Sequence, residues 1–210
     1  MGLSYAVITS VDRDDLPDYG SDIFAQTITQ IRHRIKDCKI EVLIPDFEGE
    51  FESLKRVIES GPHVLNHNIE TVRRVFRKVR PRGNYDVSLQ LLDRVKKINP
   101  RMPSKSGIMV GLGETKSEIH ETMADLRHAN CDLLTIGQYL APSPRHLAVD
   151  RFPEPEIFGE WDQAARQMGF KAVACGPLVR SSYRGGLLYE EAKGGEVTLT
   201  YGESTNGETL

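Results

Sequence analysis

Polar side chains that could recognise a small ligand follow directly on the first apolar run of the sequence. They include the hydroxyl groups of Thr9 and Ser10, the carboxylate of Asp12 and the guanidinium of Arg13. A carboxylate suits an ammonium group and an arginine suits a carboxylate, so Asp12 and Arg13 could bind a zwitterion. A solvated loop that caps the following helix is the alternative. The residue types alone leave both interpretations open.

A second polar cluster, from Asn66 to Thr71, follows another apolar run. Asn66 or Asn68 could cap the next helix. An asparagine near a carboxylate, here Glu70, also suits the paired hydroxyls of a ribose, and the two roles are compatible. His67 could act as a general base, but no nucleophile or metal ligand lies at motif spacing from it.

Two further stretches carry features that a ligand could use. Glycines in the stretch 107–114 would let a ligand approach the backbone closely, because no side chain intervenes. Glu114 lies where a helix should begin, which also suits interaction with the helix dipole. The basic, hydroxyl-rich stretch 176–184 could bind phosphate or form a polar loop. The sequence contains no Ser/His/Asp set, no zinc-ligand spacing and no P-loop.

The elements that must position these groups follow from the hydrophobic pattern. Short apolar runs alternate with amphipathic segments, which predicts a parallel sheet wrapped by helices with right-handed crossovers. Both an open or partial barrel and a flat sheet fit this pattern. Ligands in such folds gather at the carboxyl ends of the strands, where the polar stretches lie. The expected strands are 5–9, 40–44, 63–65, 107–110, 133–136 and 171–174, and the expected helices lie near 23–35, 51–58, 71–79, 89–95, 115–126 and 155–168.

Length and composition limit the classes of function. The 210 residues suffice for one core, or one core with an appendage. A net charge of -3 gives no reason to expect nucleic acid or an anionic membrane as partner. No apolar run approaches the roughly 18 residues of a membrane span, and no signal-peptide layout is present. We therefore expect a cytoplasmic protein, or a mitochondrial or plastid matrix protein if the source is eukaryotic. The stretch Gly202–Leu210 is expected to be mobile.

Five stretches resemble segments of the lipoyl synthase family, in one order and at compatible spacing. The resemblance covers nearly all of the chain, and the shorter stretches VRP (79–81) and HLAV (146–149) agree with it. The five are VITSVDRDDLPD (7–18), NHNIETV (66–72), KSGIMVGLGET (105–115), LTIGQYL (134–140) and GPLVRSSY (176–183).

This resemblance implies a fold and an activity. The family is a radical S-adenosylmethionine group, so the expected fold is α/β, a partial parallel (β/α) barrel with its first strand missing here and with a C-terminal extension. The boundary is expected between a barrel of residues 1–178 and a C-terminal segment of residues 179–210. The implied reaction inserts two sulfur atoms, at C6 and C8 of a protein-bound octanoyl-lysine, to make the lipoyl cofactor. The protein's task in such chemistry is to position the reactants and exclude water.

The resemblance also implies cofactors and partners. The cofactors are S-adenosylmethionine and two 4Fe–4S clusters, one that cleaves S-adenosylmethionine reductively and an auxiliary one that supplies sulfur. The partners are octanoylated lipoyl carrier domains or proteins and an electron donor such as a flavodoxin or a ferredoxin. Neither nucleic acid nor a membrane is an expected partner.

The resemblance also implies a candidate site, because residues with known roles in the family match positions in this sequence. Ser182 matches the serine ligand of the auxiliary cluster, with Arg180 and Tyr183 in support. Asn66 and Glu70 match ribose contacts. The stretch of Thr9, Ser10, Asp12 and Arg13 matches the element that holds the methionyl group, and the element beside the adenine matches Gly107, Met109, Gly111 and Glu114.

The sequence departs from the family in its cysteines. The family's CxxxxCxxxxxC and CxxxCxxC motifs precede the VITS strand, whereas Cys38, Cys131 and Cys175 match none of those positions. A cluster without thiolate ligands should not assemble, so this chain alone is expected to be catalytically inactive. A fragment of a lipoyl synthase is one interpretation. A non-catalytic remnant that binds S-adenosylmethionine or a lipoyl carrier protein is the other, and an aldolase-type enzyme lacks a convincing acid–base set.

Overall fold

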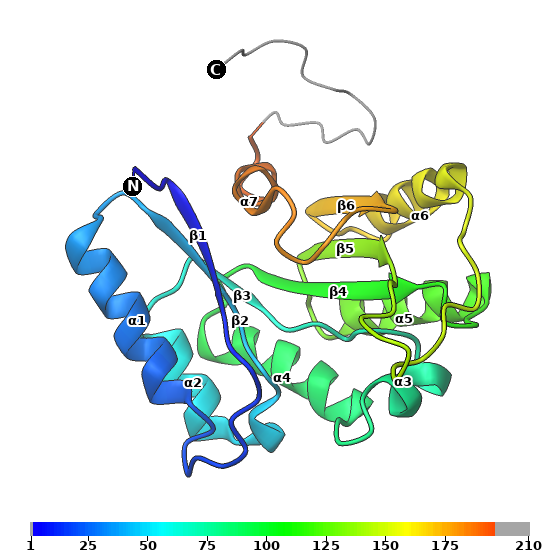
Figure 1. Ribbon diagram of the computed structural model, residues 1–210. Coiled ribbons are helices and arrows are strands. Elements are labelled where there is room, and N and C mark those ends of the chain that lie inside the picture. Colours follow the sequence, from blue (N-terminus) through cyan, green and yellow to red (C-terminus); the bar gives the residue numbers. More distant parts are fainter. Residues whose placement is uncertain (1, 196–210) are drawn as a thin grey trace.

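The computed structural model describes residues 2–195, which contain one six-stranded sheet flanked by helices (Figure 1). All six strands are parallel and lie in sequence order across the sheet. β1 and β6 each pair on one side only, so the sheet is open, as expected for a partial barrel. The strands are β1 (Tyr5–Thr9), β2 (Lys39–Leu43), β3 (Val64–Asn66), β4 (Ser104–Val110), β5 (Leu133–Gln138) and β6 (Ala172–Gly176).

All six predicted strands are confirmed, and the largest shift is at the start of β4, which begins at Ser104 rather than at Gly107. The six predicted helices are confirmed as well. They are α1 (Ser21–Arg34), α2 (Phe51–Glu59), α3 (Arg73–Val79), α4 (Tyr85–Ile98), α5 (Lys116–His128) and α6 (Pro155–Gln167), and a short 3₁₀ turn, η1 (Phe47–Gly49), precedes α2.

Local sequence explains where several helices begin. Thr115 caps α5 in a capping box with Glu118, in which each side chain accepts a hydrogen bond from the other residue's backbone N–H. The Asn84 side chain accepts hydrogen bonds from the backbone of Asp86 and Val87 at the start of α4. Pro155, with its fixed φ, opens α6.

One helix is missing from the prediction. α7 (Gly185–Ala192) follows the turn after β6, within the segment expected to be only a C-terminal extension. Its first two residues are Gly185 and Gly186, which are unfavourable in helices, so the sequence does not show the beginning of this helix. The mobility predicted for Gly202–Leu210 concerns residues outside the described range. The boundary predicted at residue 179 stays a prediction.

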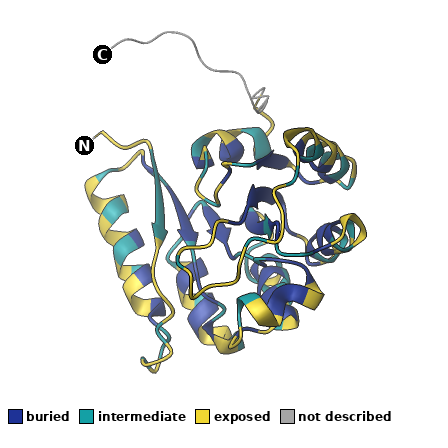
Figure 2. Cartoon of the chain, turned by 45° about the vertical axis from the view of Figure 1, so that its right-hand side comes forward, coloured by how far each residue is buried: buried dark blue, intermediate teal, exposed yellow. Residues whose placement is uncertain are grey.

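The sheet separates the helices on its outer face from α7 on its inner face (Figure 1). Side chains alternate between these faces along each strand. Leu134 and Ile136 of β5 lie in the outer core with Phe158 and Trp161 of α6, while Leu133 lies in an inner cluster. Buried residues concentrate in the strands and on the facing sides of the helices (Figure 2).

α7 contacts both β1 and β6 across the inner face. Leu188 of α7 packs in the inner cluster with Leu133 of β5 and Ala172 and Ala174 of β6. Gly185 allows the close approach to β1, because a Cβ at this position would lie 2.9 Å from Cε1 of Tyr5. The helix therefore fills the inner face between the two edges of the open sheet.

A buried polar layer lies beside α7 on the inner face. The Glu41 carboxylate accepts hydrogen bonds from Tyr5 Oη at 2.7 Å, Asn66 Nδ2 at 2.9 Å and Lys105 Nζ at 3.0 Å. These groups come from β1, β2, β3 and β4, so one carboxylate joins four strands. Within residues 2–195, no helix combines the length and the apolar composition needed to cross a membrane.

Candidate active site

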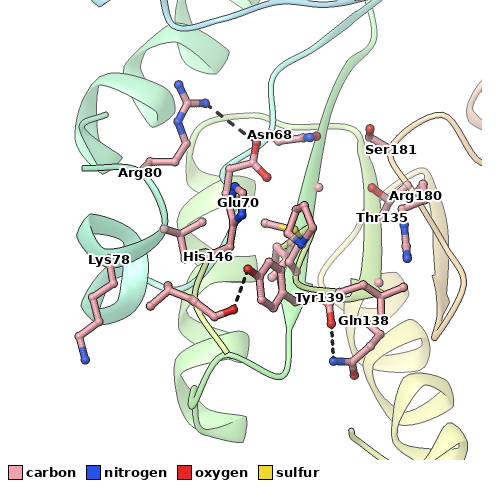
Figure 3. Close-up of a pocket in the computed structure, with 18 of the residues that line it drawn as sticks. Asn68, Glu70, Lys78, Arg80, Thr135, Gln138, Tyr139, His146, Arg180 and Ser181 are labelled. Atoms are coloured by element: carbon pink, nitrogen blue, oxygen red, sulfur yellow. Dashed lines mark hydrogen bonds and ion pairs between the residues drawn. The ribbon is translucent and has the colours of Figure 1, made fainter. Parts of the chain in front are cut away.

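A pocket of about 1010 Å³ opens where the strands of the sheet end (Figure 3). This is the edge at which parallel α/β folds bind ligands. It combines polar groups with an apolar mouth, and its size suits a ligand larger than a single metabolite. Its lining comes from β4, β5, the end of α3 and the segments after β3, α3, β5 and β6. It includes Asn68, Glu70, Lys78, Val79, Arg80, Gly107, Met109, Thr135, Gly137, Tyr139, Leu140, Arg145, His146, Leu147, Arg180 and Ser181.

Gly107 forms the floor of a cradle between two polar side chains. A Cβ at this position would lie 2.8 Å from Oδ1 of Asn68 and 2.9 Å from Oγ1 of Thr135. Among the described residues, the buried Oδ1 of Asn68 has no hydrogen-bond partner. A buried acceptor without a partner is costly, so a ligand that donates a hydrogen bond here would be favoured.

Glu70 has a strained backbone beside this cradle. Its φ of 66° lies in the left-handed region that a residue with a side chain rarely adopts. The backbone of β4 holds it there, because Glu70 N–H donates to Gly107 O at 3.1 Å and Met109 N–H donates to Glu70 O at 2.6 Å. Such strain concentrates at functional sites.

Burial raises the pKa of the Glu70 carboxyl from 4.5 to about 7, although Arg80 and Asn68 act in the opposite direction. Arg80 lies with its guanidinium 4.0 Å from Glu70 and donates to Asp12 at 3.1 Å. Figure 3 shows Arg80 and Glu70 on one side of the cavity. The carboxyl group is thus able to carry a proton near neutral pH.

The mouth of the pocket is built by the segment that follows β5. Tyr139 donates through its hydroxyl to Leu147 O at 2.9 Å, which ties the two ends of this loop together (Figure 3). Leu140 and Leu147 remain 49% and 37% exposed, although both are large apolar side chains. Exposed apolar side chains at a pocket mouth suit contact with an apolar ligand group.

The predicted residues after β1 do not line the pocket in this structure. Thr9, Ser10 and Asp12 are exposed, and the Arg13 guanidinium is paired with Asp15 through two hydrogen bonds of 2.7 Å. Asp12 is linked to the pocket through Arg80. The role assigned to this stretch stays a prediction.

The side chains of Asn66 and Asn68 have different surroundings in the structure. Asn66 is fully buried and donates to Glu41 at 2.9 Å, one layer below the cavity, whereas Asn68 lines it. The resemblance assigned a ribose contact to Asn66, whereas Asn68 is the asparagine that lies beside Glu70 in the cavity. The ribose role of Asn66 stays a prediction. His67 is buried between Ile44 O and Ser88 Oγ, both at 2.9 Å, which is a structural arrangement.

Only the first part of the glycine-rich stretch 107–114 lines the cavity. Gly107 and Met109 line the cavity, whereas Gly111 and Glu114 do not. The buried Glu114 carboxylate accepts hydrogen bonds from the backbone of Gly111 and Leu112, both at 2.8 Å. Glu114 therefore holds the turn that follows β4 and begins α5.

The turn after β6 brings Arg180 and Ser181 into the cavity lining. Ser182 is exposed and Tyr183 is half-buried, and neither lines the cavity. Gly137 permits this arrangement, because a Cβ there would lie 2.1 Å from the Val179 carbonyl oxygen. The metal-ligand role assigned to Ser182 stays a prediction.

Comparison with known proteins assigns the family. A model of the Radical SAM superfamily matches residues 1–126. Lipoyl synthase from Caldanaerobacter subterraneus is 48% identical over 194 residues, which cover 92% of this chain and 68% of that protein. The chain belongs to the lipoyl synthase family. Its counterpart from Caldicellulosiruptor bescii is 54% identical over 183 residues, covering 87% of this chain and 63% of that protein. The chain thus spans about two thirds of the length of these relatives.

Solved structures support the same fold at low sequence identity. Methylornithine synthase aligns with a TM-score of 0.58 and 13% identity, over 87% of this chain and 62% of that one. Coproporphyrinogen III oxidase from Escherichia coli, a radical SAM enzyme, aligns with a TM-score of 0.59 and 18% identity, over 79% of this chain and 41% of that one. The open six-stranded sheet is therefore a partial barrel of the radical S-adenosylmethionine type.

Family membership implies S-adenosylmethionine and a 4Fe–4S cluster as cofactors. The pocket fits the first of these, since the orphan Asn68 acceptor, which lies beside Thr135 at the bare backbone of Gly107, suits a nucleoside that donates a hydrogen bond. This chain's cysteine, histidine and carboxylate side chains do not supply the ligand set of a cluster. All three cysteines are buried and free, and no group of three metal-binding side chains occurs among residues 2–195.

Several lining residues were missing from the sequence-based site. Thr135 and Tyr139 lie in or next to β5, and their alternation with outward-facing apolar residues is a signal that places Thr135 on the inner face. Arg145 and His146 lie in a loop without regular structure, where no periodicity predicts direction. Only the three-dimensional course of the loop after β5 shows that Arg145 and His146 line the cavity.

Proposed function

We propose that this chain provides the substrate and S-adenosylmethionine pocket of a lipoyl synthase. The reaction would insert two sulfur atoms, at C6 and C8 of a protein-bound octanoyl-lysine. The observation that carries the proposal is the pocket, which pairs a polar cradle at Gly107 with an apolar mouth at Leu140 and Leu147. The names of relatives about 50% identical to the chain support it.

The two parts of the pocket would bind different groups. Asn68 and Glu70 would accept hydrogen bonds from the hydroxyls of the nucleoside. Gly107, which has no side chain, leaves the space that Asn68 and Thr135 need beside β4. The apolar side chains at the mouth would hold the octanoyl chain and exclude water from its reacting carbons. A cavity of about 1010 Å³ accommodates both ligands together.

The cofactors proposed for the intact enzyme are S-adenosylmethionine and two 4Fe–4S clusters, which supply the radical and the sulfur. Ser182 is the proposed serine ligand of the auxiliary cluster, and its exposure leaves its hydroxyl accessible. The thiols of Cys38, Cys131 and Cys175 are not suited to hold a cluster. We therefore expect no cleavage of S-adenosylmethionine by the 210-residue chain on its own.

The proposed partners are octanoylated lipoyl carrier domains and an electron donor of the flavodoxin or ferredoxin type. The proposed location is the cytoplasm, or the mitochondrial or plastid matrix. Neither nucleic acid nor a membrane is proposed as a partner, in line with the net charge of -3.

The test is turnover by the intact protein with reconstituted clusters, an octanoylated carrier domain and a reductant. Mass spectrometry should detect a carrier that has gained two sulfur atoms, together with 5′-deoxyadenosine. Ser182→Ala should retain formation of 5′-deoxyadenosine and lose sulfur insertion. Full sulfur insertion with loss of cleavage would contradict the assignment of Ser182, and a carrier that gains no sulfur with the wild type would contradict the function.

A non-catalytic binding protein is the second candidate, favoured by the absence of accessible thiols. It predicts that the 210-residue chain binds S-adenosylmethionine or the octanoylated carrier without converting either. Isothermal titration of the chain with each ligand tests this alternative. Absence of binding to both would eliminate it.

A further inference from the structure

The mouth of the pocket carries cations from three separate segments. Lys78 lies in α3, Arg145 lies in the loop between β5 and α6, and Arg180 lies in the turn between β6 and α7. We call these three side chains the basic rim. All three are exposed and all three line the pocket. The chain as a whole is acidic, with a net charge of -3, so general composition does not explain this cluster.

The basic rim has no acidic partners among the described residues. Within the described part of the chain, Arg180 donates only to the carbonyl oxygens of Pro177 at 3.4 Å and Val179 at 2.7 Å. Neither Lys78 nor Arg145 takes part in an ion pair within residues 2–195. These charges are therefore free to meet an external anion.

The two cations at the start of the same helix behave differently. Arg73 pairs with Asp86 at 2.7 Å, and Arg74 pairs with Glu118 at 2.7 Å. The protein thus neutralises the cations at the start of α3, away from the mouth. Within residues 2–195, neither Arg77 nor Lys78 near its end has an acidic partner, and of these two only Lys78 lines the pocket. Arg80, deeper in the cavity, is held by Asp12 at 3.1 Å.

The octanoyl substrate does not account for these charges. An octanoyl-lysine is neutral and would contact Leu140 and Leu147, which lie at the same mouth as Arg145. The acylated lysine must, however, extend from a folded domain that stays outside. Exposed cations around an apolar opening suit an acidic surface on that domain, because long-range attraction orients it before contact.

We propose that the basic rim docks an acidic surface surrounding the acylated lysine of the carrier domain. The inference rests on the proposed function and specifies how the substrate protein is recognised. Three separated cations around one opening favour a compact acidic domain over nucleic acid, whose regularly spaced phosphates call for a continuous basic stripe.

The experiment compares the intact protein with the variant Lys78→Glu/Arg145→Glu. Arg180 is left unchanged because it lies beside the proposed cluster ligand. The control is Lys36→Glu/Arg101→Glu, which reverses one exposed lysine and one exposed arginine ahead of β2 and β4, at the opposite edge of the sheet. Two probes are used, an octanoylated carrier domain with acidic residues around its lysine and a short, uncharged octanoyl-lysine peptide.

Surface plasmon resonance at low salt should show the rim variant binding the domain about tenfold more weakly, mainly through a slower association rate. Its affinity for the peptide should match that of the wild type, and the control should match the wild type with both probes. The difference for the domain should shrink at about 0.5 M salt, where charges are screened within a few ångströms.

Four outcomes would overturn the inference. They are unchanged binding of the domain by the rim variant, an equal loss of binding to the peptide, an equal loss in the control, and displacement of the domain by a polynucleotide at equal charge concentration. If the wild type and the rim variant bind the domain equally well, the docking role of the basic rim is refuted and the proposed function is not affected. A wild type that binds neither probe contradicts the proposed function as well.

Discussion

Lys105 Nζ lies 3.0 and 3.3 Å from the two carboxylate oxygens of Glu41, and neither side chain has any exposed surface. Tyr5 and Asn66 complete the hydrogen bonds of this carboxylate. Charges so deeply buried are retained in a protein only when they are paired and hydrogen-bonded. The pair ties β2 to β4 directly below the pocket.

Removing one partner of this pair should destabilise the fold strongly. Lys105→Met leaves the Glu41 charge buried without its cation, and we expect it to lower the free energy of unfolding by about 3–5 kcal/mol. Lys116→Met is the matched control, because the ion pair of Lys116 with Glu160 is exposed and should contribute less than about 1 kcal/mol. Urea unfolding of the intact protein measures both, and equal losses would refute the prediction.

Glu70 should make stability depend on pH. Its pKa is raised from 4.5 to about 7 in the folded state, so the folded protein binds the proton more tightly than the unfolded chain. Stability is therefore lost as the pH rises from 4.5 through 7, by roughly 3 kcal/mol at most. This is an upper limit, because 21% of the side chain is exposed.

Glu70→Gln should remove this dependence. The variant should approach the wild type in stability below pH 4.5 and exceed it above pH 7, as followed by urea unfolding across this range. The exposed Glu160 provides the control substitution, Glu160→Gln, whose stability relative to the wild type should not change in this way with pH. A constant difference between Glu70→Gln and wild type at every pH would disprove the effect.

Gly107→Ala should block the ligand cradle without unfolding the protein. The new Cβ would come within 2.8 Å of Asn68 Oδ1 and 2.9 Å of Thr135 Oγ1, so those side chains must shift into the space of the ligand. We expect the Kd for S-adenosylmethionine to rise by at least about tenfold. Gly159→Ala in α6 is the control, because no atom lies within 4 Å of its Cβ position. Isothermal titration calorimetry measures the Kd of both variants. An unchanged affinity of Gly107→Ala would show that the cradle is not part of the S-adenosylmethionine site.

The thiols should be unreactive in the folded protein. Burial raises the pKa of Cys131 to about 12 and places that of Cys175 well above its ordinary value. Cys38 is only 2% exposed. Titration of the 210-residue chain with a disulfide reagent at pH 8 should detect no rapidly reacting thiol in the folded state and three after denaturation. One thiol reacting natively at the rate of a free cysteine would contradict this prediction.

Much of the fold was predictable from hydrophobic pattern. Strands β3, β5 and β6 are buried along their whole length, β4 nearly so, and such strands appear as apolar runs, whereas the edge strand β1 is only half-buried. The helices show one apolar face. α7 was missed because Gly185 and Gly186 open it, and only its contact with Tyr5 explains why glycine is needed there.

Part of the site was predictable for the same reason. Glu70, Gly107, Met109 and Arg180 line the cavity because they follow, or lie in, strands whose ends meet at one edge. Asn66 lies outside the cavity lining and donates to Glu41, so its ribose role stays a prediction.

The sequence by itself determined the family, the order of the elements and the absence of the cysteine motifs, because each depends on residue types and their spacing. Only the tertiary structure decided which side chains share the cavity. Asn68 and Thr135 are far apart in the chain, yet both lie within 3 Å of one Cβ position at Gly107. Such proximity depends on strand register and on the loop that folds over the mouth, and neither leaves a local signal in the sequence.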